Sequence, residues 1–169
     1  STSRGLGDVY KRQDISKILS EEIKIELSEK SEKKVKECRK YLDEKLKNSK
    51  DPIYGVNTGF GSLCNHKITN EDLEQLQRNL VVSHACGIGG EVPQDIVKIM
   101  LLLKIQSLSY GHSAVQLQTI NRLIDMFNNN ILPVVFQLGS LGASGDLAPL
   151  AHMSFCLLYT SPSPRDVEE

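Results

Sequence analysis

The chain has 169 residues, a formal net charge of −1 and 40% hydrophobic residues, which is enough apolar content for a folded core. A net charge so close to zero offers no electrostatic attraction to nucleic acid or to an anionic membrane. The longest aliphatic run, residues 99–103, is far too short to span a bilayer, and no apolar block follows the early basic residues as it would in a signal peptide. We therefore expect a cytoplasmic protein that binds neither nucleic acid nor membranes.

Both ends of the chain differ in pattern from the middle. Residues 1–13 (STSRGLGDVYKRQ) and 156–169 (CLLYTSPSPRDVEE) resemble translated adaptor sequence. The last helical pattern is cut off by residues 160–165, whose two prolines cannot continue a helix. The sequence therefore predicts a non-native tail at 1–13, an authentic segment at 14–155 and a second non-native tail at 156–169; a natural C-terminal tail is the alternative.

The middle segment has a mostly helical pattern. Ile23, Ile25 and Leu27 alternate with charged residues, which predicts a short strand, and Ser28 can cap the helix that follows. This helix should end before Asp51. Its apolar positions follow helical spacing: Val35, Cys38, Leu42 and Leu46.

Further helices are predicted along the rest of the segment. A capping box at residues 69–72 precedes a helix with an apolar face, and Pro93 suits the first turn of a helix that runs toward Gly111. Another helix should cover residues 114–128, ended by three asparagines at 128–130. Residues 131–138 are expected to be extended, and Asp146 should act as the N-cap of a last, buried helix.

A glycine-rich loop is predicted at residues 54–61 (YGVNTGFG), where the backbone must turn tightly or move. Neither this loop nor the glycines at 87–90 match the dinucleotide fingerprint, so no nucleotide cofactor is expected. The four cysteines have no spacing typical of a metal site. We expect Cys38, Cys64, Cys86 and Cys156 to be free thiols, and no metal to be bound.

The most informative stretch is residues 139–153 (GSLGASGDLAPLAHM), which contains Ala143, Ser144 and Gly145. If the Gly145 amide nitrogen attacks the Ala143 carbonyl carbon, a five-membered ring closes. Loss of water from the ring and from the Ser144 side chain then leaves an exocyclic methylidene, a soft electrophile. Closure favours a small residue at the attacked position and glycine at the attacking one. The helix N-terminus predicted at Asp146 would stabilise negative charge that develops nearby.

This stretch resembles the ammonia-lyases that carry the 4-methylidene-imidazol-5-one (MIO) group, and the resemblance extends over about residues 15–155. It implies a mainly α fold, the N-terminal part of the helical ammonia-lyase fold of the fumarase/aspartase-like superfamily, with a short N-terminal strand and glycine-rich loops. It also implies a homotetramer with active sites shared between subunits. Family members are several times longer, so the chain resembles an N-terminal fragment that is inactive by itself.

The resemblance also assigns roles to individual residues. Tyr54 corresponds to the general base on the mobile loop that also contains Gly61, although a phenol with a pKa of about 10 needs its anion stabilised. Ser83 and His84 correspond to the positions that face the substrate side chain, and this pair resembles histidine ammonia-lyases. Asp146 supports the electrophile. The implied reaction is elimination of ammonia from L-histidine to give trans-urocanate.

The sequence departs from the family pattern at residues 110–116. His112, Ala114 and Gln116 replace an aromatic residue, a glycine and an arginine, and none of them is assigned a catalytic role. Three alternatives stay open: a phenylalanine or tyrosine ammonia-lyase, an aminomutase of the same family, and a non-catalytic helical protein with an inert loop.

Overall fold

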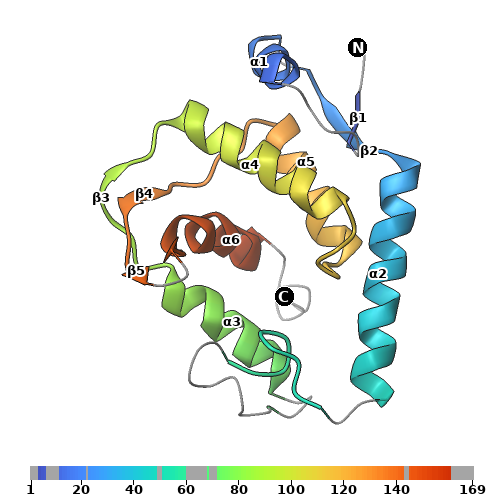
Figure 1. Ribbon diagram of the computed structural model, residues 1–169. Helices are drawn as coiled ribbons and strands as arrows, with labels where there is room; N and C mark the ends of the chain where they lie inside the picture. The colour runs from blue at the N-terminus through green and yellow to red at the C-terminus, as the bar shows by residue number, and fades with distance from the viewer. Residues whose placement is uncertain are drawn as a thin grey trace, which may run out of the picture. The chain divides into compact units, whose positions relative to one another are not determined.

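A computed structural model of the chain describes residues 4–6, 12–21, 23–48, 51–59, 68, 72–142 and 145–160 (Figure 1). The chain divides into two compact units. The first comprises Ser1–Ser49 and Pro93–Leu132, and the second comprises Lys50–Val92 and Pro133–Glu169. The described residues are mainly helical, with a few short strands, which confirms the predicted fold class.

The first unit contains the longest helix that the structure describes, α2, together with α4 and α5. Helix α4 packs against α5, and α2 packs against both. The short strands β1 and β2 pair in parallel, with Arg4 opposite Ile25 and Leu6 opposite Leu27. The elements are β1 (Arg4–Leu6), α1 (Arg12–Ser20), β2 (Ile25–Leu27), α2 (Glu29–Asn48), α4 (Gln94–Ser109) and α5 (Leu117–Asn128). The fully buried side chains of this core include Ile18, Ile25, Val35, Val97, Leu101, Leu102, Ile105 and Ile120.

Helix α2 begins where the sequence predicts. The Ser28 hydroxyl accepts a hydrogen bond from the Ser31 amide at 3.3 Å, which confirms Ser28 as the cap. Ser31 and Val35 are the buried residues of this helix, and much of its remaining surface carries exposed ion pairs one turn apart, such as Lys40–Glu44 at 3.8 Å. Such pairs add only about 0.3–0.5 kcal/mol each to helix stability.

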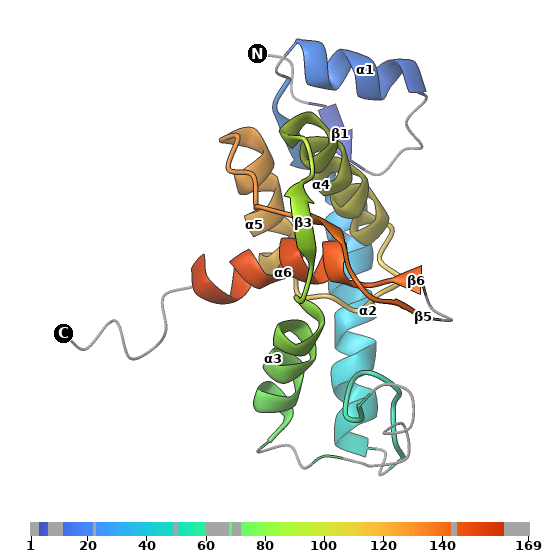
Figure 2. The same ribbon diagram turned by 90° about the vertical axis from the view of Figure 1, so that its left-hand side faces the viewer.

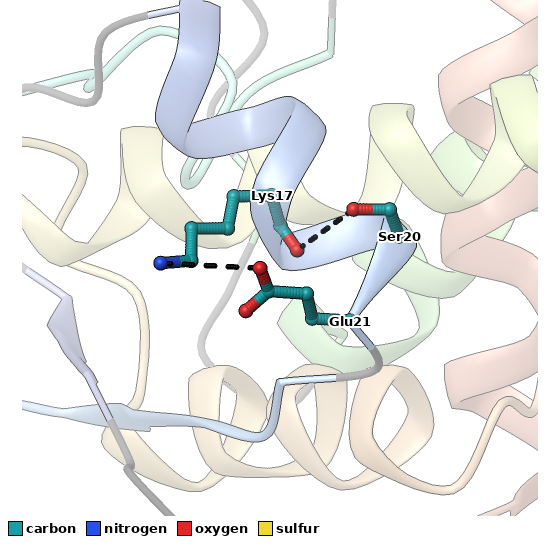
Figure 3. Close-up of polar contacts among 3 residues, drawn as sticks. All are labelled: Lys17, Ser20 and Glu21. Carbon is teal, nitrogen blue, oxygen red and sulfur yellow. Dashed lines mark hydrogen bonds and ion pairs between the residues drawn. The ribbon is translucent and has the colours of Figure 1, made fainter.

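The end of α1 carries two surface contacts of this kind (Figure 3). The Ser20 hydroxyl donates to the Lys17 carbonyl at 3.4 Å, and the Lys17 ammonium lies 3.9 Å from the Glu21 carboxylate. Both charged side chains are half exposed, so this pair contributes little to the fold.

Left-handed residues follow the ends of helices α4 and α5. Gly111 (φ 73°) follows α4, and a Cβ on it would lie 2.8 Å from the Lys34 Cβ of α2, so both conformation and packing require glycine there. Asn130 (φ 55°) follows α5. The Ile131 amide donates to the Met126 carbonyl at 2.8 Å and the Asn130 amide to the Phe127 carbonyl at 3.2 Å, which is a Schellman motif. The three asparagines therefore end this helix as predicted.

Helix α5 begins at Leu117, three residues later than predicted. The reason lies in the backbone before it: Ala114 is left-handed (φ 52°) and Gln116 is extended (ψ 139°). The Ala114 carbonyl accepts a hydrogen bond from the Arg39 guanidinium at 3.4 Å. The departure from glycine noted at position 114 therefore falls at a position where a Cβ is sterically unfavourable.

Replacing Ala114 with glycine should stabilise the chain. The left-handed conformation destabilises a folded alanine by roughly 1–2 kcal/mol. Glycine avoids this cost, but it raises the entropy of the unfolded chain, which lowers stability by about 0.4–1 kcal/mol. We expect a net gain of about 1 kcal/mol in the free energy of unfolding, measured by urea denaturation. Ser113→Gly, at the neighbouring position with an ordinary φ, is the control and should destabilise the chain. A lower denaturation midpoint for Ala114→Gly would show that Ala114 is not strained.

The described residues of the second unit form two helices packed against each other and two pairs of short strands. Helix α6 packs against α3 and against β4, and β3 pairs antiparallel with β4. Strands β5 and β6 lie side by side (Figure 2), with Leu141 opposite Asp146 and Gly142 opposite Gly145. The elements are α3 (Leu73–His84), β3 (Ile88–Glu91), β4 (Phe136–Leu138), β5 (Leu141–Gly142), β6 (Gly145–Asp146) and α6 (Ala148–Thr160).

Several predictions meet the structure only in part. Helix α6 begins at Ala148, two residues after the predicted cap, and continues to Thr160. The capping box predicted at 69–72 lies mostly outside the described residues. Strand β1 lies in the predicted tail at 1–13, and α6 enters the one at 156–169, while most residues of both tails are not described. The non-native origin of the tails stays a prediction. Among the described residues no helix is long and apolar enough to cross a membrane.

Candidate functional site

The second unit contains a cavity of about 370 Å³ between the end of α3, the β5–β6 hairpin and the start of α6. Its lining brings together the predicted substrate-facing pair and one residue of the predicted electrophile. The lining residues are Ser83, His84, Cys86, Ser140, Gly142, Gly145, Leu147 and Ala148. Ala143 and Ser144 lie outside the described residues.

His84 is held by the last turn of its own helix. Its Nδ1 lies 2.6 Å from the Leu80 carbonyl oxygen, and because a carbonyl only accepts, Nδ1 carries the proton in this bond. The Ser83 hydroxyl lies 3.1 Å from the same carbonyl and 3.2 Å from His84 Nδ1. In the neutral tautomer with its proton on Nδ1, the ring has its hydrogen-bond acceptor at Nε2.

The hairpin that carries Gly145 is tightly built. Gly145 is left-handed (φ 81°), so its backbone conformation favours glycine. The Asp146 carboxylate accepts a hydrogen bond from the Ala148 amide at 3.0 Å, and thus satisfies the first amide of α6 although the helix begins one residue later than an N-cap at Asp146 would give. A Cβ on Gly139 would overlap Asp146 Oδ1 and lie 2.6 Å from the Ala148 Cβ. Glycine at 139 is therefore needed for this close approach.

A histidine outside the predicted site residues connects the segment after α3 to α6. The Gly87 amide donates to His152 Nε2 at 2.8 Å, and the His152 ring packs edge-on against Phe136, with centroids 5.4 Å apart. A Cβ on Gly87 would lie 2.6 Å from His152 Nε2. This contact fastens the segment after Cys86 to α6. Its sequence signal was the position of His152 within the 139–153 motif.

The loop that carries Tyr54 is held together by buried polar side chains. The Asn57 carboxamide accepts from the Ile53 amide at 2.6 Å, and the Thr58 hydroxyl accepts from the Gly55 amide at 3.2 Å. Gly55 is left-handed (φ 68°), which explains a glycine directly after the tyrosine. Tyr54 itself is 62% exposed and is not part of the described lining of the cavity. Gly61 lies outside the described residues.

The remaining residues considered for chemistry fall elsewhere. His112 and Gln116 are exposed residues of the first unit. Cys38 and Cys86 are free thiols, and Cys64 is not described; burial raises the pKa of the Cys156 thiol above its usual value. No group of three or more histidine, cysteine or acidic side chains suited to a metal occurs within the part of the chain that the structure describes.

Comparison with known proteins assigns this arrangement to a family. The family described as aromatic amino acid lyase matches residues 10–162. Histidine ammonia-lyase of Legionella pneumophila strain Philadelphia 1 is 48% identical over 144 residues, which cover 85% of this chain and 28% of that protein. Histidine ammonia-lyase of Alkaliphilus oremlandii is 42% identical over 152 residues, which cover 90% of this chain and 30% of that protein.

Solved structures of a tyrosine aminomutase and of a histidine ammonia-lyase share the fold of this chain. Tyrosine aminomutase from Streptomyces globisporus superposes with a TM-score of 0.77 at 30% identity, over 84% of this chain and 26% of that one. Histidine ammonia-lyase from Trypanosoma cruzi superposes with a TM-score of 0.74 at 29% identity, over 86% of this chain and 28% of that one. The chain thus spans less than a third of the length of these relatives.

Proposed function

The chain belongs to the aromatic amino acid lyase family, and we propose from this premise that it forms part of a histidine ammonia-lyase. The reaction is the non-oxidative deamination of L-histidine to trans-urocanate and ammonia. The observation that carries the proposal is the cavity in which Ser83 and His84 lie with Gly145. The name histidine ammonia-lyase on relatives at 42–48% identity supports the choice of substrate.

Residues 143–145 are proposed to form the 4-methylidene-imidazol-5-one group, without metal or nucleotide. Gly142 pairs with Gly145, and Gly145 is left-handed, a conformation that favours glycine at the residue whose amide would attack in ring closure; both observations support the proposal. When formed, the group supplies an electrophile that converts the substrate amine into a good leaving group. Asp146, which holds the start of α6, keeps the adjoining helix N-terminus in place.

The other residues act on the substrate directly. The Nε2 acceptor of His84 suits a hydrogen bond from a protonated imidazole nitrogen of histidine, with Ser83 beside it. Tyr54 is proposed to take the β-proton of the substrate as general base. Since Tyr54 lies outside the described lining of the cavity, the position of its loop relative to α3 decides whether the phenol reaches the substrate.

The longer protein is proposed to be a cytoplasmic homotetramer in which several subunits complete each active site. The 169-residue chain by itself is then expected to be inactive, with residues 143–145 unmodified, because the surrounding helices that strain the loop are missing from it.

An aminomutase is the second candidate, because tyrosine aminomutase shares this fold at 30% identity. It would use the same electrophile and base and return the amine to the neighbouring carbon. Product analysis separates the two activities, since a lyase releases free ammonia. A phenylalanine or tyrosine ammonia-lyase would differ at Ser83 and His84.

Ammonia release from three amino acids tests the proposed substrate. The full-length protein should deaminate L-histidine at least about tenfold faster than L-phenylalanine or L-tyrosine, because a phenyl ring cannot pair with the half-buried His84 ring, and a polar group left unpaired by a bound substrate costs roughly 1–3 kcal/mol. His84→Leu should lower kcat/KM for histidine by about 10–100-fold and leave formation of the electrophile intact.

The control variant is Val82→Ala, at an exposed position on the same helix, and it should leave the preference unchanged. Faster turnover of phenylalanine or tyrosine by the unaltered protein would refute histidine as the substrate, although the lyase family would stand.

A further inference from the structure

Gln77 links the loop of Tyr54 to the helix that carries the substrate-facing pair. Its side-chain nitrogen donates hydrogen bonds to the Gly55 carbonyl at 3.1 Å and to the Val56 carbonyl at 2.8 Å. These are the two carbonyls that follow Tyr54 directly in the chain. Gln77 lies on α3, seven residues before His84, so the two residues share one face of the helix.

Residues 53–57 of the loop keep one shape, because hydrogen bonds within the loop join its two ends. The Val56 and Asn57 amides both donate to the Ile53 carbonyl, at 3.0 and 3.2 Å. The Asn57 side chain in turn accepts from the Ile53 amide, so both ends of the turn are fastened to each other. Hydrogen bonds to the Gly55 and Val56 carbonyls therefore also fix the position of the Tyr54 backbone.

We infer that Gln77 is a positioning residue, which sets the distance between Tyr54 and the pair Ser83–His84. This inference rests on the proposed role of Tyr54 as the base. Two turns of α-helix fix the Gln77 and His84 backbones at about 10 Å along the helix axis. A loop fastened at one end of this span holds the phenol at a defined distance from a substrate bound at the other end, and proton abstraction depends steeply on such distances.

The two hydrogen bonds of Gln77 are exposed to solvent. Water can replace either bond, so Gln77 biases the loop toward one position without locking it. The expected effect of losing it is therefore a partial loss of rate.

Gln77→Glu is the sharpest variant, because it keeps the shape of the side chain and replaces its donor with an acceptor that repels both carbonyls. In the 169-residue chain, hydrogen exchange at the Val56 and Asn57 amides should become roughly tenfold faster. The Ala85 amide at the end of α3, which donates to the Val81 carbonyl, should exchange at its original rate and so report that the helix remains folded.

Gln75→Glu is the matched control. Gln75 lies on the same helix and donates to the Asn79 side chain at 2.7 Å, so this variant makes the same change of charge without touching a loop carbonyl. Gln77→Arg keeps donor groups, so exchange at the Val56 and Asn57 amides should be slower in this variant than in Gln77→Glu. If Gln77→Glu unfolds the helix, Gln77→Met, which is neutral and lacks a donor, replaces it in the same experiment.

The second arm is catalytic and uses the full-length protein. Gln77→Glu should lower kcat for L-histidine by about tenfold with KM within twofold, because binding by Ser83 and His84 is unchanged while the base is misplaced. Unchanged exchange at the loop amides, or faster exchange with unchanged kcat, would overturn the inference. If the unaltered full-length protein releases no ammonia, the proposed function fails, and the exchange arm then decides by itself whether Gln77 holds the loop.

Discussion

Ser144→Ala is expected to abolish deamination of L-histidine by the full-length protein. Without a hydroxyl on Cβ no methylidene can form, and the substrate amine remains a poor leaving group. We expect kcat to fall by at least about 1,000-fold, since covalent activation divides a difficult elimination into feasible steps. The measurement is ammonia release at saturating histidine.

Ser154→Ala is the control for this prediction. Ser154 lies on α6 and donates its hydroxyl to the Leu150 carbonyl at 2.8 Å, outside the proposed tripeptide. Its replacement should leave turnover within about twofold, as is usual for a helical serine that bonds its own backbone. An Ser144→Ala enzyme of undiminished activity would remove the electrophile from the mechanism.

Tyr54→Phe should lower kcat by about 10²–10⁴-fold, the range expected when a general base is lost. The substitution removes one hydroxyl from an exposed side chain, so the fold and the value of KM should change little. Tyr41→Phe, at a similarly exposed tyrosine of the charged helix α2, serves as the control and should have no effect. Retention of more than half the original kcat by Tyr54→Phe would mean that another group takes the β-proton.

Features that depend on a few neighbouring residues could be predicted from the sequence. The Ser28 cap and the asparagines that end α5 act within one helical turn, and the structure confirms both. The position of Asp146 also indicated its interaction with the start of α6, although the helix begins at Ala148, because Asp146 accepts from the amide two residues ahead.

Other features depend on residues that are distant in the sequence, and no local pattern indicates them. Gly139 is required because Asp146 and Ala148 pack against it, and Gly87 because His152 does. Helix α5 begins later than predicted for a related reason. Ala114 adopts a left-handed conformation that its side chain disfavours, and its carbonyl accepts a hydrogen bond from Arg39 of helix α2.

The candidate site shows the same division. The motif around Gly145 and the pair Ser83–His84 could each be singled out from the sequence, and the structure places them around one cavity. The contact of Gln77 with the loop of Tyr54 joins residues more than twenty positions apart through a single carboxamide. A glutamine on an amphipathic helix gives no sign in the sequence that it will make such a contact.

Peptide mass spectrometry of the full-length protein tests most directly whether residues 143–145 form the methylidene-imidazolone. After digestion, the peptide that contains these residues should be lighter than its sequence mass by two water molecules. The same peptide from the Ser144→Ala variant should not show this loss, because its side chain has no hydroxyl to eliminate. An unmodified Ala143–Ser144–Gly145 peptide from a full-length protein that actively deaminates L-histidine would contradict the proposed electrophile.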